Sequence, residues 1–277
     1  MAFCILILII LICYNKTMVW AQRRKMAYMT GLLTFLFVVA FFVFQSVTNV
    51  VPTCFDNKKN GGETNVDCGG KCLQYCPNEL LDPKVRWVRT FEVTPGVVHA
   101  VAYIEHSYPA ASAKNVKYQF RLYDTNNVLI VERQGTTYLG PMGRTAIVET
   151  LIPTGNIPVA VTRFSFVSPV PWQKSDSAFS QVVIKTDRTA LENFSGGTRL
   201  TAILDNQSRY SFSNFDVVAI LYDANDNAIT SSKILLPSLQ AQSSETVYFT
   251  WPLNIDPKSV LTLEIIPRFN PFSASEL

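Results

Sequence analysis

Four cysteines lie close together in the chain, behind an apolar N-terminal region: Cys54, Cys68, Cys72 and Cys76. Their spacing lacks the paired CxxC motifs that are typical of zinc ribbons. Four cysteines this close together in an oxidising compartment predict two disulfides, for which three pairings are possible. The spacing therefore favours a disulfide-held stalk, which we place at residues 52–84, over a zinc site.

The stalk also contains oxygen-bearing side chains that suggest calcium. Those side chains and a glycine stand at positions one, five, six and twelve of an EF-hand-like loop: Asp56, Asn60, Gly61 and Asp67. Lys58 occupies the third position, where an oxygen ligand is needed. The other interpretation is a Gly- and Asn-rich turn held by disulfides. We predict no cofactor, with calcium at these residues as the alternative.

The segment from Cys54 to Cys72 resembles a short motif that recurs beside domains of secreted and surface proteins. The motif has the form C-x-(D/N)-x(3)-N-x(2)-E-T-x-V-D-C-G-G-x-C. The ordered run from Asn60 to Gly70 carries the resemblance. The resemblance implies an extracellular spacer rather than an activity.

The chain has two histidines, His99 and His106. An odd separation points them to opposite faces of one strand, and we interpret both as solvated or edge-strand residues. The sequence contains no G-x-S-x-G, H-E-x-x-H, Walker or G-x-G-x-x-G motif. We therefore predict no catalytic residue, and we expect that the protein is not an enzyme.

A repeat of about one hundred residues organises the rest of the chain. The sequence FRLYDTNNVLI at 120–130 returns as AILYDANDNAI at 219–229. A duplicated unit of about 90 residues can bury its own core, so the repeat predicts two domains. We place them at 85–172 and 179–277, joined by a short polar link at 173–178. We expect the two domains to stand in series.

Each repeat consists of short runs rich in β-branched and aromatic residues, separated by turn residues. Runs of this kind predict two tandem Ig-like antiparallel β-sandwiches, and hence an all-β ectodomain. The runs are Val97–Ile104, Tyr118–Tyr123, Ala146–Leu151 and Val159–Val167 in the first repeat, and Leu200–Leu204, Val217–Tyr222, Thr246–Trp251 and Val260–Ile266 in the second.

The run Phe120–Asp124 matches the signature of the FxLYD domain family, which consists of Ig-like sandwiches on secreted or anchored bacterial and archaeal proteins. The second copy retains Leu221, Tyr222 and Asp223 but has Ala219 in place of the phenylalanine. The resemblance implies an Ig-like sandwich with no assigned activity.

Strand alternation explains the motif. Phe120 and Leu122 share one face, which we expect to be the core, and Tyr123 points the opposite way. Asp124 and its counterpart Asp223 then open hairpin turns.

An uncharged segment at Met26–Val51 precedes the stalk. As a helix that rises about 1.5 Å per residue, it is long enough for a hydrocarbon core of ~30 Å. Arg23, Arg24 and Lys25 stand directly before it. The positive-inside rule keeps these residues in the cytosol and places the chain after Val51 outside. We therefore predict a plasma-membrane protein with its bulk outside the cell.

A second apolar run, Ala2–Cys13, is too short at ~18 Å for a comfortable span. It has two interpretations: a second, tilted membrane segment, or an upstream extension of a protein that starts at Met18 or Met26. The formal charge of +3 comes from the anchor, because the rest holds twenty basic and twenty-one acidic residues. The charge therefore gives no indication of nucleic-acid binding.

Together these features predict a membrane-anchored, non-catalytic surface protein that acts in adhesion, in envelope organisation or as a subunit of a surface assembly. Its expected partners are the membrane and other surface or envelope proteins. The alternative is a solute-binding or sensory accessory ectodomain. A fold of this kind does not by itself indicate which of the two functions the protein has.

Overall fold

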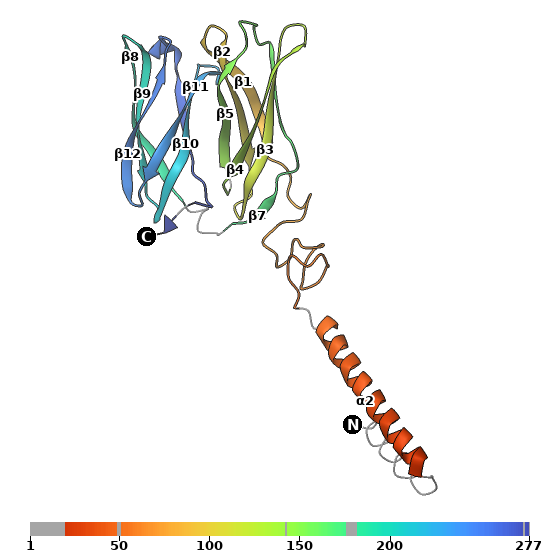
Figure 1. Cartoon of the computed structure of the whole chain (residues 1–277). Coiled ribbons are helices and arrows are strands. Elements are labelled where there is room, and N and C mark those ends of the chain that lie inside the picture. The colour runs from red at the N-terminus through yellow and green to blue at the C-terminus, as the bar shows by residue number, and fades with distance from the viewer. Residues whose placement is uncertain (1–19, 49–50, 142, 176–181, 274, 277) are drawn as a thin grey trace. The chain divides into compact units, whose positions relative to one another are not determined.

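The computed structural model describes residues 20–48, 51–141, 143–175, 182–273 and 275–276. The chain divides into two compact units, Met1–Thr53 and Cys54–Leu277. The first unit contains a helix, and the second contains the stalk and all the described strands (Figure 1). The apolar run Ala2–Cys13 lies outside the described residues.

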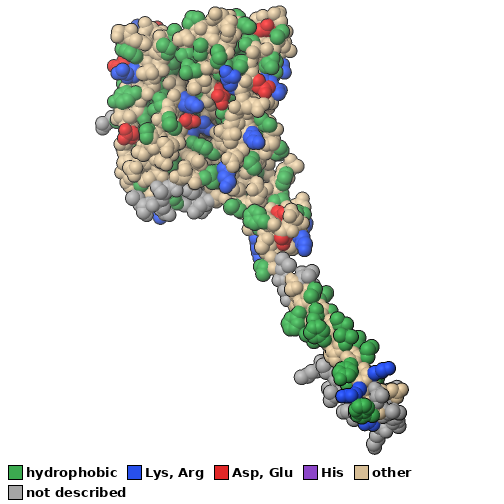
Figure 2. All heavy atoms as spheres, in the orientation of Figure 1, with side chains coloured by type: hydrophobic (Ala, Val, Ile, Leu, Met, Phe, Trp, Pro, Cys, Tyr) green, Lys and Arg blue, Asp and Glu red, His purple; other side chains and the backbone are tan. Residues whose placement is uncertain are grey.

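Helix α2 spans Trp20–Thr48, and its stretch Gln22–Ser46 is long and apolar enough to cross a membrane. The helix begins earlier than the predicted Met26, so that the three basic residues lie in its first turns. Hydrophobic side chains cover its visible face beyond them (Figure 2). Within the helix, the Thr30 and Thr34 hydroxyls donate to carbonyls of the preceding turn at 2.8 Å, which satisfies their polar groups locally.

Two antiparallel sheets form the first sandwich. Three of the predicted runs lie within longer strands, whereas the run Val159–Val167 contains a shorter strand, Val161–Phe166. One sheet has the order β1-β2-β5, with β1 at Lys84–Thr94, β2 at Val97–His106 and β5 at Gly143–Pro153. The other has the order β4-β3-β6, with β4 at Leu129–Leu139, β3 at Ala111–Tyr123, β6 at Val161–Phe166, and β7 at Trp172–Lys174 paired to the start of β3.

The second sandwich repeats this topology. One sheet has the order β12-β9-β8, with β8 at Ile184–Phe194, β9 at Gly197–Asn206 and β12 at Ser243–Trp251. The other has the order β11-β10-β13, with β10 at Tyr210–Tyr222, β11 at Ala228–Leu239, the short helix η3 at Pro257–Ser259, β13 at Thr262–Arg268, and β14 at Ser275–Glu276 paired to β10. The predicted all-β class with antiparallel sandwiches is confirmed.

Each sandwich encloses a core built from alternate residues of its strands. Phe120 and Leu122 are completely buried in the first core, and Ala219 and Leu221 take the equivalent places in the second. Tyr123 points away from the first core and is partly exposed. The inward and outward assignment made from strand alternation is therefore correct.

The turns after the two LYD motifs are hairpin turns, as predicted. The Asp124 carboxylate accepts backbone N–H bonds from Asn126 and Val128, both at 2.8 Å. Asp223 accepts the corresponding bonds in the second copy. Those N–H donors stabilise the ionised carboxylate, so the pKa of Asp223 lies below its usual value.

The two sandwiches do not stand in series as expected. Sheet β1-β2-β5 packs its outer face against the outer face of β11-β10-β13, and a third buried apolar cluster fills the space between them. The two sandwiches lie side by side in Figure 1, and across the contact β5 approaches β13 and β1 approaches β11. The first residues of the predicted link, Gln173 and Lys174, belong to β7 of the first sandwich, and its residues 176–178 lie outside the described residues.

Candidate functional site

The stalk contains two disulfides, whose pairing the sequence left open. Cys54 is bonded to Cys72, and Cys68 is bonded to Cys76. Cys72 and Cys68 are buried, so the two bonds form a small covalent core in a segment with few apolar residues.

The motif residues between the cysteines have structural roles. The Glu63 carboxylate accepts backbone N–H bonds from Asn60 at 3.3 Å and from Asp67 at 3.2 Å. Gly70 has a φ of +53°, and a Cβ atom there would lie 1.9 Å from the carbonyl oxygen of Gly62. The motif therefore specifies a tight, crossing backbone rather than a reactive group.

The calcium candidates come together in this loop, and N–H donors engage the Asp56 and Asp67 carboxylates, whereas the buried Asn60 Oδ1 atom has no hydrogen-bond partner among the described residues. Asp67 accepts from the backbone N–H groups of Asp56 and Asn57, and Asp56 accepts from the Asn60 side-chain amide at 2.8 Å. These bonds agree with the interpretation as a turn. Calcium at Asp56, Asn60 and Asp67 stays a prediction.

Another set of possible metal ligands in the described residues is Cys54, Glu63 and Cys72, whose ligand atoms lie within 4.8 Å of one another. The two sulfur atoms are joined in a disulfide and are not thiolates. The set therefore does not fit a metal in this oxidised form.

The stalk is fixed to the first sandwich by strand-like pairing. The backbone N–H of Tyr75 donates to the Trp172 carbonyl at 3.0 Å, and that of Lys174 donates to the Leu73 carbonyl at 2.8 Å. The Tyr75 side chain packs against the sandwich core. The stalk therefore extends the sheet that contains β7.

Side chains strengthen the same joint. The Trp172 indole N–H donates to the Leu81 carbonyl at 3.1 Å, and the Leu81 N–H donates to the Tyr108 hydroxyl at 3.1 Å. Asp82 accepts the backbone N–H of Val170 at 2.9 Å. The stalk is thus an integral part of the first sandwich rather than a loose spacer.

The inter-sandwich face, which we define as the contact between sheets β1-β2-β5 and β11-β10-β13, has an apolar centre. Val101 and Val148 of the first sandwich and Val218 and Ile220 of the second have 2% or less of their surface exposed. Beside them Trp87 stacks on Tyr103, with 5.3 Å between ring centroids. Burial of this apolar area stabilises the pairing of the two sandwiches.

Several groups of hydrogen bonds surround this centre. In the first, the Glu264 carboxylate accepts the hydroxyl protons of Tyr103 at 2.7 Å and Tyr222 at 3.1 Å. Burial, followed by the neighbouring Glu264, raises the pKa of both phenols. Both tyrosines therefore stay neutral donors.

In the second group, the Arg89 guanidinium reaches the hairpin turn after the second LYD motif. It donates to the Ala228 carbonyl at 2.9 Å and to the Asn227 side chain at 3.1 Å. The motif turn of the second repeat is thus part of the contact.

In the third group, the Arg268 side chain is only 5% exposed and donates to Asp216 at 3.3 Å and to the Thr145 hydroxyl at 3.2 Å. It also donates to Thr137. Tyr138 donates to the Arg268 carbonyl, and burial raises the pKa of Tyr138 to about 12. These bonds give a buried charge the partners that it needs.

Histidine placement differs from the prediction. His106 is only 8% exposed, and its ring lies 4.9 Å from the Trp172 ring, beside the stalk joint. His99 is partly buried at the inter-sandwich face, where it hydrogen-bonds to the backbone of Ser231. The prediction of solvated residues is wrong because the second sandwich covers the face of β2 that carries His99, and Trp172 covers His106.

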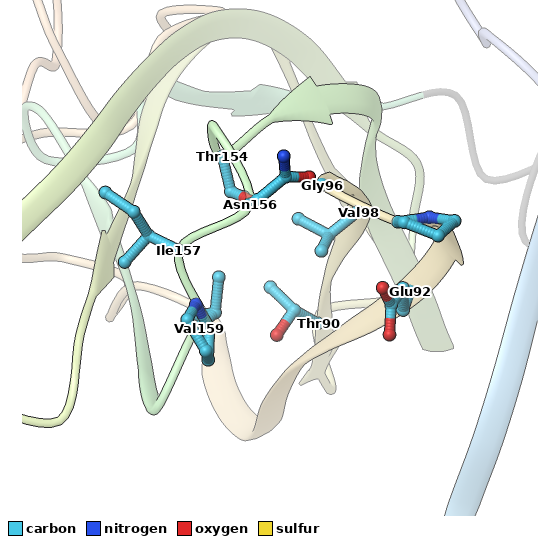
Figure 3. Close-up of a pocket in the computed structure, with 10 residues that line it drawn as sticks. Thr90, Glu92, Gly96, Val98, Thr154, Asn156, Ile157 and Val159 are labelled. Atoms are coloured by element: carbon cyan, nitrogen blue, oxygen red, sulfur yellow. The ribbon is translucent and has the colours of Figure 1, made fainter.

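A cavity of about 370 Å³ lies between the β1–β2 hairpin and the segment after β5 (Figure 3). Its polar side chains are Thr90, Glu92, Thr154 and Asn156, and its apolar lining includes Val98 and Val159. Glu92 is the one carboxylate among the lining residues described. The site could bind a small polar molecule, but it does not offer the paired carboxylates of a hydrolase.

No protein-family model matches the chain, and no curated protein matches it. The features that bear on function are the joint between the stalk and the first sandwich, the inter-sandwich face and the cavity at Glu92.

Proposed function

We propose that this protein is a membrane-anchored, non-catalytic surface protein that serves as a subunit of an adhesive or envelope assembly. In this proposal α2 crosses the plasma membrane, with Arg23, Arg24 and Lys25 in the cytosol and the unit from Cys54 onward outside the cell. Two disulfides in the stalk support an oxidising location. We further propose that both repeats are FxLYD-type sandwiches.

The observation that carries the proposal is that the stalk and the two sandwiches are joined by hydrogen bonds and buried apolar contacts. The stalk pairs with β7, and the first sandwich packs on the second through a buried apolar face. A body joined in this way holds its free surfaces at fixed positions relative to one another. Fixed presentation suits a protein that spaces or binds its neighbours.

The outer face of sheet β4-β3-β6 is the surface that we propose for a partner protein. It carries Lys117, Gln119 and Arg121, with an ion pair of 2.6 Å between Arg121 and Glu132. The equivalent face of the second sandwich is covered by the first. An open, polar face is suited to a reversible contact, because non-obligate interfaces are about as polar as the rest of a protein surface.

The cavity at Thr90, Glu92 and Asn156 favours the second candidate, a solute-binding accessory protein. Its single carboxylate is suited to a cationic or hydroxylated small molecule.

Protease treatment of intact cells tests the proposed orientation. We expect external protease to remove the unit after Val51 without lysis, and alkylation to label Cys54, Cys68, Cys72 and Cys76 only after reduction. Cleavage only after lysis, or four thiols that react without reductant, would contradict the proposal.

Photo-crosslinking on native membranes tests the assembly role. A photoreactive residue at Gln119 should capture a defined neighbour, whereas one at Tyr248, on the β12-β9-β8 sheet, serves as the matched control. Equal capture at both positions would show that the β4-β3-β6 face is not selective.

A further inference from the structure

The two histidines occupy the two joints of the Cys54–Leu277 unit. His99 lies on β2 at the inter-sandwich face, and His106 ends β2 between the rings of Tyr108 and Trp172 at the stalk joint. In both residues the Nδ1 atom is buried and finds no hydrogen-bond partner among the described residues. Both imidazoles therefore suit the neutral form.

Burial and one positive group disfavour protonation of His99. Lys233 of β11 disfavours its protonation, and the Lys233 ammonium itself donates to the Val148 carbonyl of β5 at 3.1 Å. On the neighbouring strand β1, the residue opposite His99 is the apolar Phe91, and Arg89 lies two positions before it. The Lys233 ammonium has the Asp216 carboxylate as an ion-pair partner at 3.9 Å.

At His106 burial is the main effect that disfavours protonation. The residue lines a cavity of about 90 Å³, together with Arg144 of the first sandwich and Arg268 of the second. Their carboxylate partners are Glu105 and Asp216 respectively. The remaining hydrogen bond of the imidazole is to the backbone of Gly140.

We propose that both joints loosen in acid: protonation of His99 releases the inter-sandwich face, and protonation of His106 releases the stalk from the first sandwich. In each joint the added proton at Nδ1 would be buried without an acceptor, and at His99 it would also face the Lys233 ammonium. Opening of the joint returns the imidazolium to water and removes these costs.

The direction of the pH dependence follows from burial. Burial lowers the pKa of His99 and of His106 in the closed joints, whereas an open joint restores a pKa near 6.5. Each joint is therefore fully stable above about pH 6.5 and weakens as the pH falls below it. Each pH unit increases the open fraction by up to about tenfold per histidine, until the pKa of the closed joint is reached.

Tryptophans report on each joint separately. Trp87 stacks on Tyr103 at the inter-sandwich face, Trp172 lies against His106, and Trp251 is buried in the second core as an internal control. We suggest fluorine NMR of the full chain, labelled with fluorotryptophan and held in detergent, from about pH 7.5 to about pH 5. Relaxation by a soluble paramagnetic agent measures the exposure of each ring.

We expect Trp87 and Trp172 to become exposed below about pH 6 while Trp251 stays protected. His99→Gln should abolish the response of Trp87 alone, and His106→Gln that of Trp172 alone, so each variant is the control for the other. If a glutamine variant exposes Trp251 at neutral pH, the asparagine variant replaces it.

Constant protection of Trp87 and Trp172 over the whole pH range would overturn the proposal. A response that persists in the histidine variants would do so as well. Neither result depends on which side of the membrane the unit occupies, so failure here is distinguishable from failure of the proposed function.

Discussion

The outer faces of β3 and β10 occupy the same place in the two repeats, but one is open and the other is covered. On β3 the outward residues before Tyr123 are Gln119 and Arg121, and on β10 their counterparts are Val218 and Ile220. Both strands have the same inward alternation. The difference shows that the outward residues decide whether a sandwich of this kind stays open or carries a second one.

The same contrast holds for the other sheet of each repeat, whose central strand is β2 or β9. On β2 the outward residues Val101 and Tyr103 are buried in the contact, whereas Thr201 and Ile203 on β9 stay partly exposed. The contact joins two different faces of the repeat and would continue indefinitely if every copy kept its apolar residues. The two free faces carry mostly polar residues and so lack an apolar centre like that of the contact.

The largest effect on stability is expected when Ile220 of β10 is replaced by arginine, the residue that β3 has at the equivalent position 121. Ile220→Arg places an unpaired charge in the buried contact and should lower the free energy of unfolding by about 3–5 kcal/mol. Denaturant unfolding of the full chain in detergent measures it. Gln119→Arg, on the open face of β3, is the control and should unfold like wild type. Equal stability of the two variants would contradict the contrast.

Leu122→Ala and Leu221→Ala test the cores that the repeats share. Both leucines are completely buried, so each change should cost about 2–5 kcal/mol through lost burial and a cavity. Thermal unfolding would detect it. A loss at only one of the two positions would show that the repeats are not equivalent inside.

Tyr103→Phe should have a smaller effect. It removes the hydrogen bond to the Glu264 carboxylate but keeps the stacked ring, so we expect a loss of about 1.5–3 kcal/mol. Tyr123→Phe, at the open face, is the matched control. If both changes are neutral, the polar rim of the contact does not contribute to stability.

Arg121→Ala should have the smallest effect. The ion pair with Glu132 is exposed, and Glu132 stays solvated after the change. We therefore expect no measurable change in the midpoint of thermal unfolding. A clear destabilisation would mean that the open face contributes to the fold.

The residues of each strand that point into the core could be predicted from the sequence. Alternation around Phe120 and Leu122 identified the first core, and the aspartate of each LYD motif identified the turn. These features depend on neighbours in the same strand or hairpin, which the sequence displays directly.

The contact between the repeats was missed, although a signal was present. Val217–Leu221 is an unbroken apolar run, buried at every position, which is typical of a strand covered on both faces. The setting of His99 and the disulfide pairing could not be predicted, because both depend on segments that only the fold brings together.

The central claim is that the two sandwiches form one rigid body through the inter-sandwich face. Pulsed electron paramagnetic resonance between spin labels at Gln134 and Thr246 tests it, with labels on unnatural residues that leave the disulfides intact. At neutral pH we predict one narrow distance distribution, which broadens in Ile220→Arg. A broad distribution in the wild-type chain would contradict the account and restore two sandwiches in flexible series.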